Sequence, residues 1–277
     1  MKFIKDATWA YKKWQTGEDV IFVDCRFDLK DPLKGKQEFE TDHLPGAVYF
    51  DLDQDLSSEV RSTGGRHPLP DIKQFVQKVQ NAGISNDTTV IAYDQGHPFA
   101  SRFCWLMTYL GHEKTYVINR GYQEWVDQGY PTETETKAKE KGDFQPTIQT
   151  NLAVNQQYVK ENRTNPNTAL IDSRSFERYA GNREPIDAKA GHIPGAEHYD
   201  WVNLFTEKGY WKESSDLKKH FEGLVNYEEI IVYCGSGVTA TPNVIGLWEA
   251  QLPNVKLYVG SWSDWISNPA NPIETTT

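Results

Sequence analysis

The sequence is poor in cysteine, in basic charge and in long apolar runs. Its three cysteines among 277 residues are an odd number with no CxxC pair, which argues against a secreted disulfide framework. Its 29 basic residues against 39 acidic residues give a net charge of −10, which argues against a nucleic-acid or anionic-membrane partner. No stretch approaches the roughly 18 apolar residues of a membrane span, and Met1–Ala10 lacks a signal-peptide core. We therefore expect a cytoplasmic protein that binds neither membranes nor nucleic acids.

The sequence does contain an internal repeat. Four short segments recur in the same order about 140 to 150 residues later. The first copies are 21–26, 43–47, 89–94 and 121–125, and the second copies are 169–174, 192–196, 229–234 and 261–265. A period of this length indicates duplication of a whole domain. The polar segment Thr132–Gly142 has no large apolar residue, so we place the boundary within 132–152 and expect domains at 1–140 and 151–277.

Short, apolar, β-branched segments alternate with helical patterns in both copies. The segments expected to be buried strands are Ile21–Val23, Val90–Tyr93, Leu170–Ile171, Ile230–Tyr233 and Leu257–Val259. Phe75–Val79 and Phe103–Leu110 are expected to be helical. Short continuous apolar strands with intervening helices favour a mainly parallel sheet covered on both faces. We therefore predict an α/β protein of two tandem domains, each with helices on both faces of its sheet.

The two copies differ where one strand ends. The first continues as Asp94-Gln95-Gly96-His97, and the second as Cys234-Gly235-Ser236-Gly237-Val238-Thr239-Ala240-Thr241-Pro242. Ligands of open α/β sheets bind at the carboxyl ends of strands. Gly235 and Gly237 allow backbone N–H groups to turn toward an anion, and a helix that begins near Pro242 adds its positive end. We expect Cys234 to react as a thiolate there. The alternative is a small buried core residue.

This loop, the segments His43–Ala47 and His192–Ala196, and the tandem duplication resemble the rhodanese/3-mercaptopyruvate sulfurtransferase superfamily over essentially the whole chain. The resemblance implies two rhodanese-like domains with a catalytic cysteine only in the second, which agrees with Asp94 in the first. It also implies sulfur transfer from 3-mercaptopyruvate or thiosulfate, through a Cys234 persulfide, to a thiophilic acceptor. That acceptor is cyanide or a thiol, and the thiol can belong to a thioredoxin-like reductant. No metal or organic cofactor is implied.

The resemblance also assigns roles to single residues. Mercaptopyruvate enzymes carry Gly-Ser after the cysteine, as here, where thiosulfate-preferring rhodaneses carry basic residues. In the mercaptopyruvate enzymes the loop serine forms a proton relay with an aspartate and a histidine. The matching residues here are Ser236, Asp53 and His67. The alternative for Asp53 and His67 is a surface turn. The residues expected to bind the donor are Arg178, Gly235, Gly237, Val238 and Thr239.

One departure from the mercaptopyruvate branch concerns its second arginine. Arg183-Glu184-Pro185-Ile186-Asp187 lacks the arginine at the family's position, so thiosulfate stays open as the donor. Arg183 is either a substitute or a solvated loop charge.

Other residues fit packing better than catalysis. His43 and His192 recur in both copies although only one has the cysteine, which indicates a structural role in a turn. The remaining residues expected in the core are Cys25, Cys104, Trp125, Trp262 and Trp265.

Two other functions are alternatives to sulfur transfer. A phosphatase of the Cdc25 type needs an arginine at the end of the cysteine loop, and none lies between Cys234 and Ala250. A non-enzymatic persulfide carrier or regulatory binding module remains the alternative to an enzyme.

Overall fold

The computed structural model describes residues 1–96, 98–252 and 254–276. They form two compact units that are not continuous in sequence. The first unit comprises Met1–Ser58, Leu69–Gln149 and Glu207–Trp211, and the second comprises Glu59–Pro68, Thr150–Thr206 and Lys212–Thr277. The segment 59–68 therefore belongs to the second unit, although it lies far upstream of the polar connection. That connection, Thr132–Gly142, is mostly exposed, as its composition predicts.

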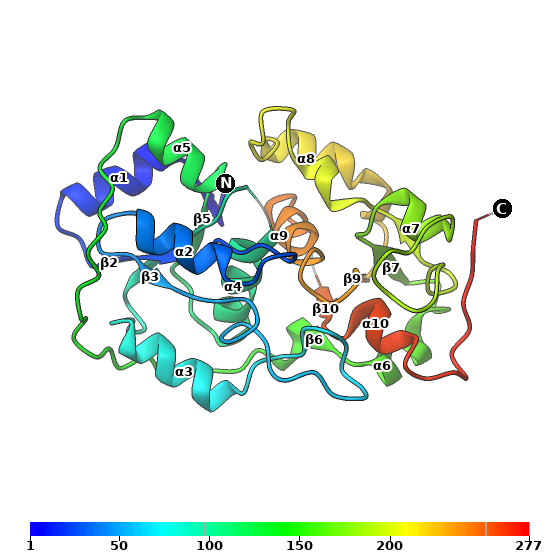
Figure 1. Cartoon of the computed structure of the whole chain (residues 1–277). Helices are drawn as coiled ribbons and strands as arrows, with labels where there is room; N and C mark the ends of the chain where they lie inside the picture. Colours follow the sequence, from blue (N-terminus) through cyan, green and yellow to red (C-terminus); the bar gives the residue numbers. More distant parts are fainter. Residues whose placement is uncertain (97, 253, 277) are drawn as a thin grey trace. The chain divides into compact units, whose positions relative to one another are not determined.

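The first unit, most of which is coloured blue to green in Figure 1, is built on a parallel sheet with the strand order β1-β5-β4-β2-β3. Its strands are β1 Ile4–Lys5, β2 Val20–Asp24, β3 Val48–Tyr49, β4 Thr89–Tyr93 and β5 Thr115–Ile118. Its helices are α1 Ala7–Gln15, α2 Lys34–Thr41, α3 Ile72–Asn81, α4 Pro98–Tyr109 and α5 Gly121–Asp127.

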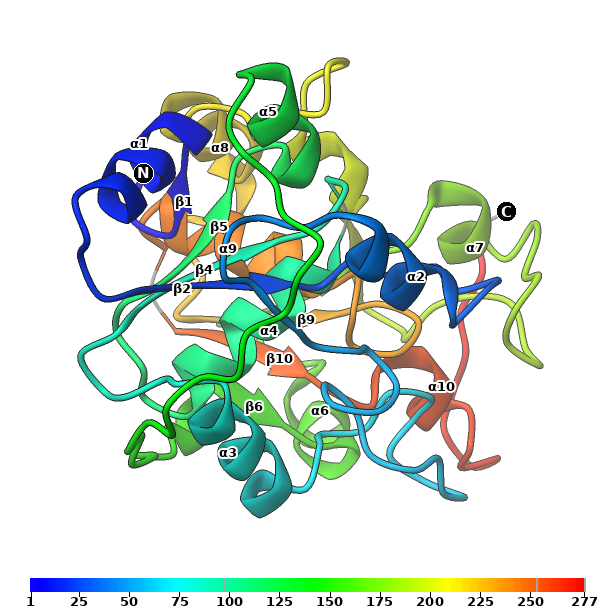
Figure 2. The same ribbon diagram turned by 60° about the vertical axis from the view of Figure 1, so that its left-hand side comes forward.

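Helices cover both faces of this sheet. On one face Ala7 of α1, Phe39 of α2 and Trp125 of α5 pack against Phe22 and Ile91 of the central strands. Helices α3 and α4 lie on the other side of the strands from α1 and α5 (Figure 2). Trp125 is fully buried, and truncation of such a side chain costs about 3–5 kcal/mol. The predicted three-layer arrangement is confirmed for this unit.

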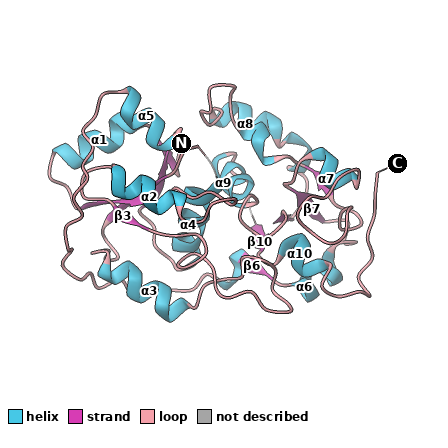
Figure 3. Ribbon diagram, in the orientation of Figure 1, coloured by secondary structure: helices cyan, strands magenta, loops and turns pink. Residues whose placement is uncertain are grey.

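The second unit repeats this topology with the strand order β6-β10-β9-β7-β8, again parallel throughout. Figure 3 shows its strands β6, β7 and β10 in magenta among cyan helices. Its strands are β6 Ala153–Val154, β7 Thr168–Asp172, β8 Glu197–His198, β9 Glu229–Tyr233 and β10 Val255–Tyr258. Its α-helices are α6 Gln156–Asn162, α7 Phe176–Ala180, α8 Ser214–His220, α9 Thr241–Glu249 and α10 Ser261–Trp265. Short 3₁₀ turns occupy η1 Thr150–Leu152, η2 Trp201–Leu204 and η3 Glu222–Leu224.

The core of the second unit lies on both faces of β7 and β9. Val159 of α6 and Trp262 of α10 pack against Leu170 and Ile231 on one face. Helix α9 packs against β9 and β10 and is in turn contacted by α8. The α/β fold predicted for this half is also confirmed, and the middle strand β9 ends directly before Cys234.

The residues assigned to packing are buried as predicted. Cys25, Cys104, Trp125, Trp262 and Trp265 are each 0% exposed. The Nδ1 atom of His43 lies 2.7 Å from the Phe39 carbonyl oxygen, and that of His192 lies 2.8 Å from the Tyr179 carbonyl oxygen. The same local contact in both copies supports a structural role. Across the described residues, none of the helices has the length and apolar character needed to cross a membrane.

Candidate active site

Cys234 occupies the turn between β9 and α9. Helix α9 begins at Thr241 with Pro242 in its first turn, as the sequence predicts. Cys234 is 1% exposed, about as buried as Cys25 and Cys104, so burial alone does not separate a reactive thiol from a core thiol. The difference lies in its surroundings, because the Gly237 N–H donates to the Cys234 Sγ at 3.2 Å. A backbone N–H favours negative charge on sulfur.

Backbone geometry makes Gly237 obligatory in this loop. Its φ of +79° is in the left-handed region, and a Cβ there would lie 2.2 Å from the Val259 carbonyl oxygen. The loop closes into α9 because Thr241 donates from N and from Oγ1 to the Val238 carbonyl oxygen, at 3.0 and 2.7 Å. The N–H groups of Ser236, Val238 and Thr239 make no hydrogen bond to a described residue. These donors are therefore open to an anionic ligand.

Ser261 holds the backbone of Cys234 in place. Its Oγ accepts the Cys234 N–H at 3.1 Å and donates to the Tyr258 carbonyl oxygen at 2.9 Å. Ser261 is fully buried and has a φ of +55°, a left-handed conformation that is unfavourable for a residue with a Cβ. The N–H of Trp262, the next residue of α10, donates to the Cys234 carbonyl oxygen at 3.0 Å. Strain at a buried residue that contacts the nucleophile is typical of a functional site.

The segment 59–68 is fastened to the start of α10. The Gly64 N–H donates to Asp264 Oδ1 at 2.7 Å, and the Arg66 N–H donates to Ser263 Oγ at 3.1 Å. A Cβ on Gly65 would lie 2.3 Å from the Gly260 carbonyl oxygen, so only glycine fits this approach. These contacts place the next residue, His67, beside the cysteine loop.

Two residues predicted for the proton relay, His67 and Ser236, are in direct contact within the second unit. His67 Nδ1 lies 2.7 Å from Ser236 Oγ, and both residues are buried, at 8% and 6% exposed. His67 is therefore not a surface turn residue. Asp53 belongs to the first unit, where its N–H donates to Asp51 Oδ1 at 2.8 Å. Partial burial and the Asp51 carboxylate raise the pKa of the Asp53 carboxyl. Its part in the relay stays a prediction.

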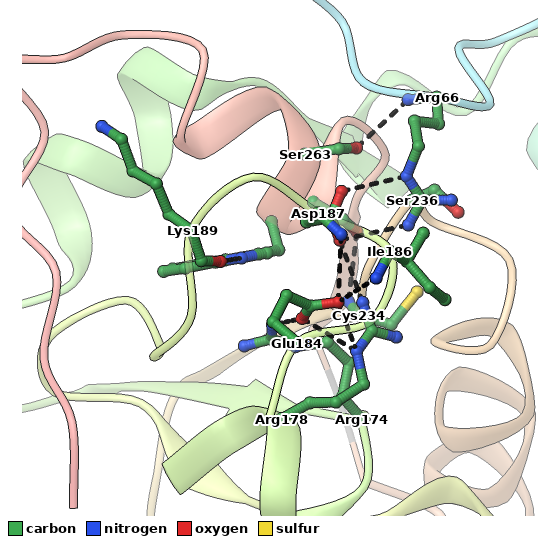
Figure 4. A network of polar contacts seen from close by, with 12 residues as sticks. Arg66, Arg174, Arg178, Glu184, Ile186, Asp187, Lys189, Cys234, Ser236 and Ser263 are labelled. Atoms are coloured by element: carbon green, nitrogen blue, oxygen red, sulfur yellow. Dashed lines mark hydrogen bonds and ion pairs between the residues drawn. The ribbon is translucent and has the colours of Figure 1, made fainter. Parts of the chain in front are cut away.

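Two guanidinium groups flank the residue after Cys234. A Cβ on Gly235 would lie 2.9 Å from Arg66 Nη2 and 3.2 Å from Arg178 Nη2. Both arginines share the carboxylate of Asp187, to which Arg178 Nη2 donates at 2.9 Å, Arg66 Nε at 3.0 Å and Arg66 Nη2 at 3.2 Å (Figure 4). The donor-binding residue expected from the sequence, Arg178, is thus next to the loop.

Glu184 fixes the other edge of Arg178. Arg178 Nε donates to its two carboxylate oxygens at 3.1 and 2.9 Å, and Arg174 Nη1 donates to it at 3.3 Å. Burial opposes ionisation of Glu184, but the hydrogen bonds from Arg178 and from the Asp187 N–H outweigh it and lower the pKa of this carboxyl. The carboxylate therefore stays charged and holds the guanidinium in one orientation.

The residues of this site that were not predicted from the sequence are Arg66, Glu184, Asp187 and Ser261. Arg66 directly precedes His67, and this position next to a predicted site residue could have indicated that Arg66 also belongs to the site. Arg183, for which the sequence left open a substitute for the missing arginine or a solvated loop charge, is exposed. Within the described ranges, no cluster of three or more histidine, cysteine, aspartate or glutamate side chains could hold a metal ion.

The fold and this loop define a rhodanese-type protein. The chain belongs to the rhodanese family, because the model of the Rhodanese-like domain matches residues 6–128 and again 155–268. It is 37% identical to a probable 3-mercaptopyruvate sulfurtransferase of Pseudomonas aeruginosa, over 93% of each chain. It is 32% identical to the thiosulfate sulfurtransferase of Rattus norvegicus, over 92% of this chain and 88% of that one.

A similar solved structure is SseA from Escherichia coli, described with the rhodanese fold and the mechanism of 3-mercaptopyruvate sulfotransferases. It aligns with a TM-score of 0.82 and 29% identity, and the alignment covers 95% of this chain and 100% of that one.

Proposed function

We propose that this protein is a sulfurtransferase that moves a sulfane sulfur from 3-mercaptopyruvate or thiosulfate, through a persulfide on Cys234, to a thiophilic acceptor. The observation that carries the proposal is the surroundings of one thiol. Cys234 Sγ accepts a backbone N–H, Ser236 of the same loop lies 2.7 Å from the ring of His67, and guanidinium groups flank Gly235. The named activities of the two relatives support the same reaction.

The first half-reaction is a nucleophilic displacement on sulfur. The Cys234 thiolate attacks the sulfur of 3-mercaptopyruvate, an S–S bond forms and the C–S bond breaks. The electron pair of that bond leaves on carbon as the enolate of pyruvate, which then takes a proton. The hydrogen-bonded pair of His67 and Ser236 is placed to deliver that proton. Thiosulfate needs no such proton, because sulfite leaves as a stable anion.

The second half-reaction regenerates the thiolate. A cyanide ion or a thiolate attacks the outer sulfur of the persulfide, and the S–S bond to Cys234 breaks with its electrons returning to Sγ. The products are thiocyanate or an acceptor persulfide. A small thiol and a thioredoxin-like reductant are both chemically suitable acceptors, and a reducing cytoplasm agrees with three free cysteines.

Counting turnovers separates an enzyme from the alternative, a persulfide carrier. Full-length protein is mixed with excess 3-mercaptopyruvate and a small thiol, and released pyruvate is measured. Many equivalents of pyruvate per chain are expected, since the acceptor clears Cys234 after each transfer. A single equivalent, with no further release on adding thiol or cyanide, would establish a carrier instead.

A further inference from the structure

Two guanidinium groups from distant segments converge on Gly235. Arg178 comes from α7 and Arg66 from the segment 59–68, and both belong to the second unit. An added Cβ on Gly235 would touch both side chains, at 2.9 Å for Arg66 and 3.2 Å for Arg178. A ligand above the backbone of Gly235, next to the thiol of Cys234, would therefore meet both cations.

The buried carboxylate of Asp187 sets the spacing of this pair. Its side chain is 3% exposed and accepts from both arginines. Arg66 donates hydrogen bonds from Nε and Nη2 to Asp187. Arg178 donates from Nε to Glu184 and from Nη2 to Asp187. The Nη1 nitrogen of each guanidinium donates to no residue in the described part of the chain. Each cation thus keeps N–H donors for a ligand.

Both arginines are also reachable from solvent. The side chain of Arg66 is 31% exposed and that of Arg178 is 16% exposed. Ile186 stands where the resemblance to the mercaptopyruvate branch implies a second arginine, and Arg183 is exposed on the loop before it. A second cation at the site is therefore supplied by a different segment.

We propose that Arg66 is the specificity-determining partner of Arg178, and that the two guanidinium groups bind the carboxylate and the keto oxygen of an α-keto acid donor. This inference rests on the proposed sulfur transfer and assigns the residue that selects between its two donors. A planar guanidinium matches a carboxylate through paired N–H donors, and two separated cations suit a donor with two separated oxygen groups. Thiosulfate, a compact anion, needs only Arg178.

Donor kinetics of Arg66→Ala test this assignment. We expect the KM for 3-mercaptopyruvate to rise about 10- to 100-fold, the range for loss of a charged hydrogen bond. The kcat and the constants for thiosulfate should change less than about threefold. Arg66→Lys should recover only part of the loss, because an ammonium cannot pair with both oxygens. Arg61→Ala is the matched control, an exposed arginine in the same segment, and should leave both donors unaffected.

A second readout does not depend on turnover. Iodoacetamide should alkylate the thiolate of Cys234, and pyruvate, which has the carboxylate and keto group but no sulfur, should slow that reaction. Protection should need about 10- to 100-fold more pyruvate in Arg66→Ala than in the native protein. If the protein lacks sulfurtransferase activity yet this protection depends on Arg66, sulfur transfer is refuted and the keto-acid site stands.

Three outcomes would overturn the proposal. Unchanged KM and unchanged protection in Arg66→Ala would remove Arg66 from the site. Equal losses with both donors would show that it does not select the donor. A fall in kcat for both donors together with a lower melting temperature, without a change in pyruvate protection, would show that Arg66 only braces the loop through Asp187.

Discussion

The loops that follow β4 and β9 occupy equivalent places in the two units but begin with different residues. Asp94 and Cys234 each follow the middle strand of their sheet, and a helix N–H binds each carbonyl oxygen, from Tyr122 at 2.6 Å and from Trp262 at 3.0 Å. In the first loop the Asp94 carboxylate accepts the N–H groups of Gly96 and Ala100, both at 2.8 Å. In the second loop the equivalent residue is Cys234, whose Sγ accepts the N–H of Gly237. The first copy thus carries a hydrogen-bonded carboxyl side chain where the second carries a thiol.

The residue that opens the following helix differs in the same way. Gly121 and Ser261 have nearly the same left-handed φ, +59° and +55°. A Cβ on Gly121 would lie 2.1 Å from the Asp94 carbonyl oxygen, so glycine is required. In the second unit a side chain fits, and its Oγ binds the Cys234 N–H. In the second unit the left-handed backbone of Ser261 is strained, but its side chain makes a hydrogen bond that positions Cys234.

The largest expected effect comes from removing the nucleophile. Cys234→Ser should lower sulfurtransferase turnover at least ~10³-fold with both donors, because a serine hydroxyl is not ionised at neutral pH and forms no persulfide. The free energy of unfolding should change little. Steady-state kinetics and urea unfolding check both statements. Cys104→Ala is the matched control, a buried thiol in the first unit, and should keep its turnover. Substantial activity in Cys234→Ser would remove the functional difference between the two loops.

Removal of the loop hydroxyl should separate the donors. Ser236→Ala breaks the contact with His67 and should lower kcat/KM for 3-mercaptopyruvate by about 10²–10⁴-fold, the usual range for general acid–base catalysis. Thiosulfate should lose much less, since sulfite leaves without a proton. Conversely, Ser236→Lys should favour thiosulfate by adding positive charge beside a doubly charged donor. Equal losses for both donors in Ser236→Ala would mean that the serine only shapes the loop.

The contrast between Gly121 and Ser261 predicts opposite tolerances. Ser261→Ala leaves the buried Cys234 N–H without its acceptor and should cost about 1–3 kcal/mol in urea unfolding, with reduced turnover. Ser261→Gly loses the same bond but relieves the left-handed strain, so it should be more stable than Ser261→Ala by about 1 kcal/mol. Gly121→Ala should destabilise strongly, because the new Cβ meets backbone. Equal stability of the two Ser261 variants would show that no strain is held there.

The smallest effect on turnover is expected from substitution of Asp94 in the first loop. Asp94→Ala should lower the free energy of unfolding by about 1–3 kcal/mol, because two backbone donors lose their acceptor at a site that is 2% exposed. Asp94→Asn, which keeps one acceptor oxygen, should lose less. Sulfurtransferase turnover should be unchanged in both variants. A turnover loss without a stability loss would give Asp94 a functional part instead.

The sequence predicted the central strands better than the edges of the sheets. Segments such as Ile230–Tyr233 are continuous, apolar and fully buried, which marks a strand on its own. The edge strands β3 and β8 have two residues each, all of intermediate burial, so the sequence contains no apolar run that would predict them. Only pairing with β2 and β7 makes these residues strands.

The site was predictable where a local motif or a resemblance carried it. Cys234, Ser236 and Gly237 lie in one loop, and His67 was found through the family. Arg66 and Asp187 could not be found in this way, because they are 121 positions apart and meet only once the segment 59–68 has packed into the second unit. Ser261 was visible as part of the repeat, but its left-handed backbone and its bond to Cys234 follow from tertiary structure alone.

The central claim is that only the second loop carries sulfur, and persulfide mapping tests it most directly. The full-length protein is incubated with 3-mercaptopyruvate without an acceptor, digested, and examined by mass spectrometry. We predict one added sulfur atom on the peptide that contains Cys234 and none on Cys25 or Cys104. Burial, together with the carboxylates of Asp94 and Asp24, raises the pKa of the Cys25 thiol and keeps it inert. Sulfur on Cys25 or Cys104, or an unmodified Cys234 in protein that turns over, would contradict the account.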